Sequence, residues 1–365
     1  MSPSPRPARS RRPRARTLEQ ILALHEDAER CASAAGLRYV STDEPGISRI
    51  RSGRGFRYRH PDGSALSAAE RTAIEELAIP PAWRQVWICT APDGHLRAVG
   101  EDDRGRRQYL YHDDWRTFRD ELNFYRLIDF GRRLGPVRAA VAAQLRRRTT
   151  DRDQVLAAML RIIDLAGLRV GTQEYADEND SYGLSTLLNR HATVVGARVE
   201  FCFPAKSGRD AAVTISDAAV ARVVRRLAGP ASRPLFTVDD AAITADEVNE
   251  RLAELAAARL TAKDFRTWHG TRIAFALLRK EDAATDREQA ILNAIDAASA
   301  FLGNTRAVAR AHYVHPHVLR VYADGELPAL LAARRPVRAA QLDADERALV
   351  PLLETLLTKV RAPAG

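Results

Sequence analysis

The sequence predicts an α+β fold, in which a small, mostly antiparallel β-rich domain precedes a mainly α-helical domain. Short strand-like runs alternate with turn signals such as Pro61-Asp62-Gly63 over residues 37–112. After Trp115 the apolar residues change to a helical period over long segments. A chain of 365 residues is long enough to bury two modest cores.

In the first domain, residues 17–115, Thr17 and Gln20 form a capping-box pattern that starts a helix, and Gly36 is expected to end it. A further helix is expected near 68–77. Side chains alternate along a strand, so Arg57 and Arg59 should share one face. We expect strands at residues 37–41, 47–51, 55–60, 86–89, 96–100 and 106–112.

The second domain, residues 116–365, is expected to consist of long amphipathic helices interrupted by one β-hairpin. The hairpin is predicted from strands at 193–203 and 211–215 around a turn at 205–209. No repeat of 20 to 50 residues is apparent. We expect helices near residues 116–133, 136–148, 152–166, 216–228, 245–260, 263–280, 284–301 and 340–359.

The charge is distributed unevenly. Residues 1–16 contain six arginines, four prolines and no acidic residue, so we expect a disordered basic tail. With these six removed from the 56 basic residues, 50 remain against 47 acidic ones. The net charge of +9 therefore does not by itself indicate a nucleic-acid-binding body, and local clusters have to carry that argument.

Several classes of protein are not expected. No run of 18 apolar residues is present, and no apolar stretch follows the N-terminal arginines, so we expect neither a membrane span nor a secretory signal. Cys31, Cys89 and Cys202 are scattered and indicate core thiols in a reduced compartment. The histidine spacing around His315 fits no common zinc site, so no metal is expected.

A candidate nucleic-acid surface lies in the first domain, at residues 104–111. Arg106 and Arg107 precede Tyr109 and Tyr111, which should share one face of a strand. Arginines beside flat aromatic side chains suit a nucleic-acid groove. The alternative is a solvated edge strand with half-buried tyrosines.

Four segments of the second domain carry candidate chemistry, at 168–171 (LRVG), 205–208 (AKSG), 261–268 (TAKDFRTW) and 302–305 (LGNT) followed by 312–316 (HYVHP). Together they resemble the active site of type IB DNA topoisomerases, and more distantly that of tyrosine recombinases. The bacterial, poxvirus-like branch is most similar, and the resemblance covers roughly residues 37–323. One segment alone is a weak signal, whereas the ordered set of four is highly specific.

By this resemblance Tyr313 is the nucleophile, Arg169 and Arg266 clamp the scissile phosphate, and Lys206 is the general acid. Asn304 stands where the poxvirus enzymes carry histidine. The resemblance also implies DNA contacts through Tyr109, Tyr111, Arg106, Gln108, Tyr175 and Thr186.

The resemblance further implies an isomerase that relaxes supercoiled DNA through a 3′-phosphotyrosyl intermediate. It implies no metal, ATP or other cofactor, and two domains that form a clamp around double-stranded DNA. Such an enzyme is expected to be a monomer without an obligate protein partner, in the cytoplasm and associated with the nucleoid.

The residue types suit this chemistry. A tyrosine phenol with a pKa near 10 needs help to attack phosphorus, and two guanidinium groups can neutralise the charge that gathers on the phosphate oxygens. A 5′ alkoxide is a poor leaving group, and a lysine can give up a proton where an arginine cannot. Lys206 is one of only four lysines in the chain.

Two features depart from the expected pattern. Pro204 and Ala205 precede Lys206 where relatives commonly have glycine, which stiffens the turn. Asn304 and Tyr313 lie nine residues apart, about 13 Å along a continuous helix. They can share one phosphate only if the chain bends between them.

Two other functions are compatible with parts of the sequence. A tyrosine recombinase shares the catalytic logic, but the β-rich first domain and Asn304 favour the topoisomerase. A non-catalytic DNA-binding or nucleoid protein would account for the basic tail, but it has no need of Lys206 or Tyr313. Residue His269, on the helical face of Arg266, is expected to pack behind the site rather than act as a base.

Overall fold

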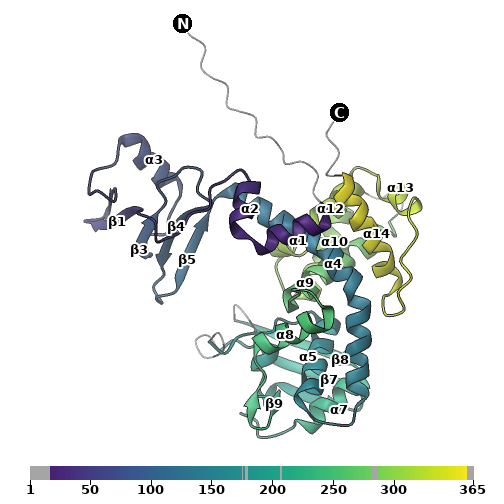
Figure 1. Cartoon of the computed structure of the whole chain (residues 1–365). Helices are drawn as coiled ribbons and strands as arrows, with labels where there is room; N and C mark the ends of the chain where they lie inside the picture. Colours follow the sequence, from purple (N-terminus) through teal and green to yellow (C-terminus); the bar gives the residue numbers. More distant parts are fainter. Residues whose placement is uncertain (1–16, 175, 177–179, 206–207, 282–285, 360–365) are drawn as a thin grey trace. The chain divides into compact units, whose positions relative to one another are not determined.

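The computed structural model describes residues 17–174, 176, 180–205, 208–281 and 286–359. The chain divides into two compact units, one of residues 1–126 with 361–365 and one of residues 127–360. The first contains a five-stranded antiparallel sheet, and the second is mainly helical with small sheets (Figure 1). The expected mixed α+β class is confirmed.

The first unit opens with two short helices, α1 (Leu18–Glu26) and α2 (Ala28–Ala34). The predicted capping box of Thr17 and Gln20 is present at the start of α1. The prediction of one continuous helix up to Gly36 was wrong, because Asp27 adopts an extended conformation. Its carboxylate accepts a hydrogen bond from the Arg30 amide at 2.9 Å, and this cap begins a second helix.

The sheet has the strand order β2-β1-β3-β4-β5, with every pair antiparallel. Five of the six predicted strands are confirmed, and helix α3 (Ala68–Glu76) lies where it was expected. The strand predicted at 37–41 was wrong, since that stretch makes only an isolated bridge between Arg38 and Gly94. The strands are β1 (Ile47–Ser52), β2 (Gly55–Arg59), β3 (Arg84–Ile88), β4 (Leu96–Glu101) and β5 (Arg107–Tyr111).

Both faces of this sheet bury apolar side chains. Ile88 and Ala98 pack on the face that also buries Ile74 of α3. Leu96 and Val99 pack on the other face. A register shift between Leu96 and Ala98 explains how residues three apart on β4 point the same way.

The first helix of the second domain is longer than predicted. Helix α4 (Asp113–Arg146) is continuous through Gly135 and Pro136, where two helices were expected. The prediction rested on the tendency of proline to end a helix. Leu134 and Val137 are almost fully buried on either side, so tertiary packing holds the helix together across the missing hydrogen bond.

Six further predicted helices are confirmed, and three short ones were missed because they span only six to eight residues and carry little periodicity. The missed helices are α11 (Arg306–His312), α12 (Pro316–Ala323) and α13 (Leu327–Ala332). The confirmed ones are α5 (Arg152–Ala166), α7 (Ala218–Arg226), α8 (Ala245–Ala256), α9 (Ala262–Leu278), α10 (Arg287–Leu302) and α14 (Ala344–Lys359).

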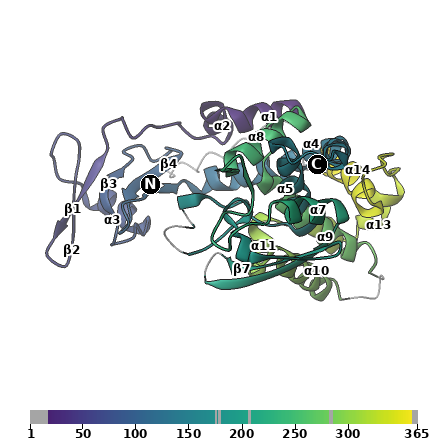
Figure 2. The ribbon, with the colours of Figure 1, turned by 90° about the horizontal axis from the view of Figure 1, so that it is seen from below.

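The predicted hairpin is part of a three-stranded sheet of β6 (Ala192–Val195), β7 (Arg198–Ala205) and β8 (Arg209–Ser216). Helices α5 and α7 pack against this sheet (Figures 1 and 2). Its packed face buries Phe201 and Phe203, whereas Cys202 is exposed on the other face. Cys202 is therefore not the core thiol we expected, while Cys31 and Cys89 are buried. A second small hairpin pairs β9 (Thr237–Val238) with β10 (Ala241–Ala242).

Helix α5 lies at the centre of the second unit and packs against α7, α8, α9 and β8. Helix α9 in turn packs against α10, α12 and α14. These two helices connect the core to the polar residues described next. Across the described ranges, no helix has the length and apolar character that a membrane crossing requires.

Candidate active site

Arg169 follows the C-terminal end of α5. Gly167 adopts the left-handed conformation, with φ of 60°, and ends the helix. The Leu184 amide donates to the Arg169 carbonyl at 2.9 Å, which fixes the backbone of the loop. Gly171 and Gly183 approach so closely that a Cβ on Gly171 would lie 2.7 Å from the Gly183 Cα. The glycine of the predicted LRVG segment is thus required for the close packing that holds Arg169.

Arg266 lies on α9 and is 4% exposed. Its two terminal nitrogens donate to the carbonyls of Gly167, at the end of α5, and of Leu302, at the end of α10, the latter at 3.0 Å. Its Nε is buried and has no hydrogen-bond partner among the described residues. The side chain therefore joins the ends of two helices to α9 and keeps one N–H available for a ligand.

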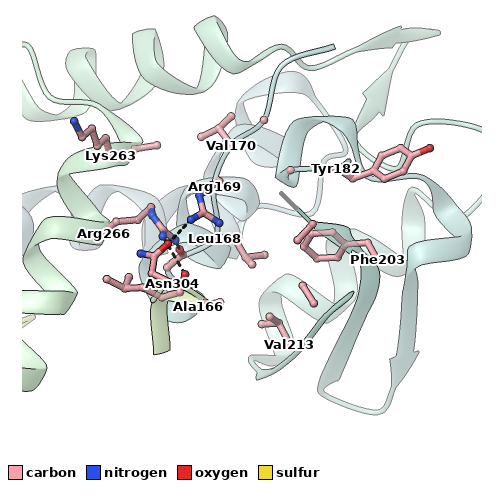
Figure 3. Close-up of a pocket in the computed structure, with 18 of the residues that line it drawn as sticks. Ala166, Leu168, Arg169, Val170, Tyr182, Phe203, Val213, Lys263, Arg266 and Asn304 are labelled. Carbon is pink, nitrogen blue, oxygen red and sulfur yellow. Dashed lines mark hydrogen bonds between the residues drawn. The ribbon is translucent and has the colours of Figure 1, made fainter. Parts of the chain in front are cut away.

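Asn304 lies in the turn between α10 and α11. Gly303 ends α10 in the left-handed conformation, and Thr305 caps α11 by accepting from the Val308 amide at 3.3 Å. Arg169 donates to Oδ1 of Asn304 (Figure 3). Because a guanidinium can only donate, the amide oxygen must face Arg169. The Asn304 Nδ2 is left buried without a partner within the described part of the chain.

Tyr313 follows the last turn of α11, at a φ of −128° and a ψ of −15° that end the helix. The next helix, α12, begins at Pro316. The Arg266 guanidinium carbon lies 5.0 Å from the centroid of the Tyr313 ring. Asn304 and Tyr313 thus flank α11, which is only seven residues long, and both line the same cavity.

Two residues of α9 that the sequence did not single out hold the Tyr313 backbone. The Thr271 hydroxyl donates to the Tyr313 carbonyl at 3.2 Å and accepts from the His315 amide at 3.1 Å. A Cβ on Gly270 would lie 2.5 Å from the same carbonyl oxygen, so only glycine fits. The sequence offered one signal for this contact: Gly270 lies inside a predicted helix, where glycine lowers helix stability and therefore often marks a close packing contact.

One cavity of about 920 Å³ is lined by the four predicted site residues Arg169, Arg266, Asn304 and Tyr313. Ala205 and Asp210, from the ends of β7 and β8, line it too. Lys206, between them in the sequence, lies outside the described residues. Lys263, exposed and one turn before Arg266 on α9, is a further cationic side chain at this cavity that the sequence did not single out (Figure 3). The sequence could have indicated this residue, because Lys263 and Arg266 are at i and i+3 of a predicted helix and therefore neighbours on its surface.

The charges around Tyr313 make its phenol easier to ionise. Burial raises the pKa of Tyr313, but the positive charges of Arg266, Arg169 and Lys263 outweigh burial, so its pKa lies below the usual value. Burial and the neighbouring charge of Arg169 lower the pKa of Arg266, which still stays charged near neutral pH. The cavity is therefore lined by the cationic side chains of Arg169, Arg266 and Lys263 and by a tyrosine whose proton is easier to remove.

The predicted DNA-contacting side chains of the first unit lie on two faces of β5. Tyr109 and Tyr111 share a face as expected, with ring centroids 6.1 Å apart, and Tyr109 is 47% exposed. Arg106 and Gln108 both bind the Asp102 carboxylate, at 2.9 and 3.0 Å. Binding DNA through Arg106 or Gln108 would have to compete with Asp102.

The DNA contacts predicted in the second domain are Tyr175 and Thr186. Tyr175 lies outside the described residues. Thr186 is 6% exposed, and its hydroxyl accepts from the Gly183 amide at 3.0 Å and donates to the Gly183 carbonyl at 3.1 Å. A DNA contact by Thr186 would require this turn to open.

Two histidines near the site, His269 and His315, are deeply buried. His269 is 4% exposed and packs against Phe265 and Phe301, with ring centroids 6.5 and 5.3 Å away. Burial lowers the pKa of His269 to about 4 and that of His315 to about 3. No group of three or more His, Cys, Asp or Glu side chains within the described ranges is arranged to hold a metal ion.

Comparison with known families adds a second line of observation. A family described as "Eukaryotic DNA topoisomerase I, catalytic core" matches residues 112–325, more than half of the chain. A family described as "Bacterial DNA topoisomerase IB, N-terminal domain" matches residues 55–102. The cavity residues Arg169, Arg266, Asn304 and Tyr313 all fall inside the first match.

Individual viral proteins are also similar. The chain is 29% identical over 294 residues to "DNA topoisomerase 1B" of Acanthamoeba polyphaga mimivirus, across 76% of this chain and 87% of the viral protein. It is 29% identical over 99 residues to "DNA topoisomerase 1B" of vaccinia virus (strain Copenhagen) and to "DNA topoisomerase I" of monkeypox virus. Those shorter matches cover 26% of this chain and 31% of each viral protein.

Proposed function

The chain belongs to the type IB DNA topoisomerase family, and from this premise we propose that it relaxes supercoiled DNA by cutting one strand through Tyr313 and resealing it. The observation that carries the proposal is the convergence of Arg169, Arg266, Asn304 and Tyr313 on one cavity. These residues come from the ends of three helices and from α9, and no single segment could hold them together.

The Tyr313 phenol gives up its proton to solvent water, its oxygen attacks the scissile phosphorus to form a 3′-phosphotyrosyl bond, and the bond from phosphorus to the 5′ oxygen breaks. Arg169 and Arg266 neutralise the charge on the non-bridging oxygens. The buried N–H groups of Arg266 Nε and Asn304 Nδ2 support this role, because each is a donor without a protein partner in the described structure. A donor of this kind contributes roughly 10²–10³ in rate.

The departing 5′ oxygen takes a proton from Lys206 in this proposal. Support comes from its neighbours, since Ala205 and Asp210 both line the cavity. Resealing reverses the same steps, with the 5′ hydroxyl attacking the phosphotyrosyl bond. The exchange conserves the phosphodiester energy, so the reaction needs no ATP, and the cationic side chains provide the charge neutralisation that a metal would otherwise supply.

The β-rich domain, residues 17–115 in our division, serves DNA binding in this proposal, and residues 116–365 form the catalytic domain. The exposed ring of Tyr109 supports this, together with the Arg107 guanidinium 5.9 Å from its centroid. The two domains act as a clamp around double-stranded DNA, and one chain is sufficient for relaxation.

Incubation with supercoiled plasmid in EDTA, without ATP, tests the proposal. Positively and negatively supercoiled plasmids are both expected to relax, at a rate proportional to enzyme concentration. Tyr313→Phe should keep DNA affinity and lose both relaxation and the covalent adduct. An absolute requirement for magnesium or ATP would falsify this mechanism. A need for specific paired sites and for several chains would instead identify a recombinase.

A further inference from the structure

A buried group of three charged side chains, Arg138, Asp164 and Glu346, lies behind the active site; we refer to it as the ion cluster. Arg138 of α4 donates to both oxygens of Asp164 on α5, at 2.8 and 2.9 Å. It also donates to both oxygens of Glu346 on α14, at 2.6 and 2.9 Å. The three side chains are 15%, 5% and 1% exposed.

The ion cluster contacts α9 directly. Trp268 Nε1 donates to Glu346 Oε1 at 3.1 Å, and His269 Nε2 lies 3.8 Å from Asp164 Oδ1. Trp268 is two residues after Arg266 on α9, and Asp164 is five residues before Arg169 at the end of α5. The cluster therefore joins the two segments that carry the arginines of the active site.

Burial alone would raise the pKa of Glu346, but its hydrogen bonds to Arg138 hold that pKa below the usual value, so the carboxylate is ionised. An ion pair this deeply buried is a poor source of stability, because desolvation offsets most of the attraction. It does impose geometry, since each partner must meet the other in one orientation. The active site needs such geometry, because arginines displaced by about 1 Å lose much of their effect.

We propose that Glu346 is a positioning residue for the reaction. Through Arg138 and Trp268 it keeps the end of α5 and the middle of α9 in register, so that Arg169 and Arg266 meet the same phosphate. Helix α14, which begins after the matched catalytic-core region ends at residue 325, is then part of the catalytic apparatus. The inference rests on the proposed roles of the two arginines.

A merely structural role makes a different prediction. Helix α14 would then be needed for folding, and damage to the ion cluster would lower the thermal midpoint without slowing the enzyme that remains folded. A positioning role and a merely structural role can be distinguished when the cleavage rate is measured well below the thermal midpoint of unfolding and DNA affinity is measured separately.

The test compares Glu346→Gln with Glu354→Gln. Both carboxylates lie on α14 and both pair with an arginine of α4, but Glu354 binds Arg132 at an exposed position, 38% and 52% accessible. Each variant is assayed for single-turnover cleavage at saturating DNA, for DNA affinity and for thermal midpoint. Glu346→Gln should cleave about tenfold to a hundredfold more slowly with unchanged affinity. Glu354→Gln should cleave like the parent chain.

The substrate distinguishes positioning of arginines from loss of the proton donor. With a 5′-bridging sulfur, which leaves without a proton, the Glu346→Gln defect should persist at the same size, because the non-bridging oxygens still need neutralising. If Glu346→Gln does not fold, Arg138→Lys keeps the positive charge but loses the forked geometry, and should show a smaller defect of the same kind.

Two outcomes overturn different statements. If Arg169→Ala and Arg266→Ala are defective while folded Glu346→Gln and Arg138→Lys cleave at the parent rate, the positioning role is wrong and the proposed function stands. If the two arginine variants themselves cleave normally, the proposed function is wrong. A defect in DNA affinity alone would also contradict the positioning role.

Discussion

The close contact between the Tyr313 backbone and Gly270 of α9 leads to a prediction whose size follows from the structure. In Gly270→Ala the new Cβ would lie 2.5 Å from the Tyr313 carbonyl oxygen and 3.0 Å from its Cβ. Both atoms are the backbone carbonyl oxygen and the Cβ of Tyr313, and neither can rotate away. Restoring an ordinary contact of 3.4 Å requires a shift of about 0.9 Å. Displacements of about 1 Å cost roughly a hundredfold in rate, or about 2.7 kcal/mol in the barrier.

The stability effect should be small and is measured separately. Alanine in the interior of a helix is favoured over glycine by about 0.5–1 kcal/mol, which opposes the cost of the clash. Gly135→Ala on α4 is the matched control, because there the nearest atom to the new Cβ is the Ala339 Cβ at 3.8 Å. That control should be as active as the parent chain and equally or more stable.

The assay is single-turnover cleavage of a short duplex whose cut strand loses its downstream fragment, so that the covalent adduct accumulates. Gly270→Ala should form the adduct about a hundredfold more slowly at saturating DNA, with its affinity retained. Thr271→Val should also be slow and Thr271→Ser should recover, since only the hydroxyl bridges the Tyr313 carbonyl and the His315 amide. Adduct formation by Gly270→Ala within about twofold of the Gly135→Ala rate would refute the reasoning.

Three further predictions concern other parts of the chain. Lys206→Ala should cleave the ordinary substrate orders of magnitude more slowly and the 5′-bridging-sulfur substrate near the parent rate; an equal defect on both would remove the general-acid role. His269 has a folded pKa of about 4, below the unfolded value near 6.5, so the stability it contributes is present above pH 6.5 and is lost as the pH falls towards 4. Between pH 7 and 5 the unfolding free energy of His269→Phe, measured by urea denaturation, should therefore fall by about 2 kcal/mol less than that of the parent chain. Parallel pH profiles of the two proteins would contradict this. Deleting residues 1–16 should flatten the dependence of log affinity on log salt by up to about 5, at 0.9 per lost contact, and an unchanged slope would show that the tail does not touch DNA.

Sequence reasoning succeeded where a residue's role depends on local pattern. The Thr17 capping box, the alternation of Tyr109 and Tyr111 and the span of α5 were all predicted, because caps and periodicity are properties of neighbouring residues. It failed where a local signal was overridden. Pro136 was expected to end a helix, and buried side chains on both sides carry α4 through it.

For the candidate site, too, part was predicted from the sequence and part was not. The resemblance of four motifs in a fixed order to those of one family predicted Arg169, Arg266, Asn304 and Tyr313 as a set, and all four line one cavity. The motifs could not predict the short helix α11 that separates Asn304 from Tyr313, since no glycine or proline between 305 and 312 marks its ends.

The sequence by itself predicted the fold class and most of the regular elements, and the resemblance of its motifs to one family named the side chains that we propose to react. Only the tertiary structure decided what holds them, because Gly270, Thr271 and Glu346 act through contacts across 42 to 78 residues of sequence. Such contacts leave no periodic trace in a single chain. A glycine that must admit a carbonyl looks like any helix glycine, and a glutamate buried against Arg138 looks like a solvated one until the helices are packed.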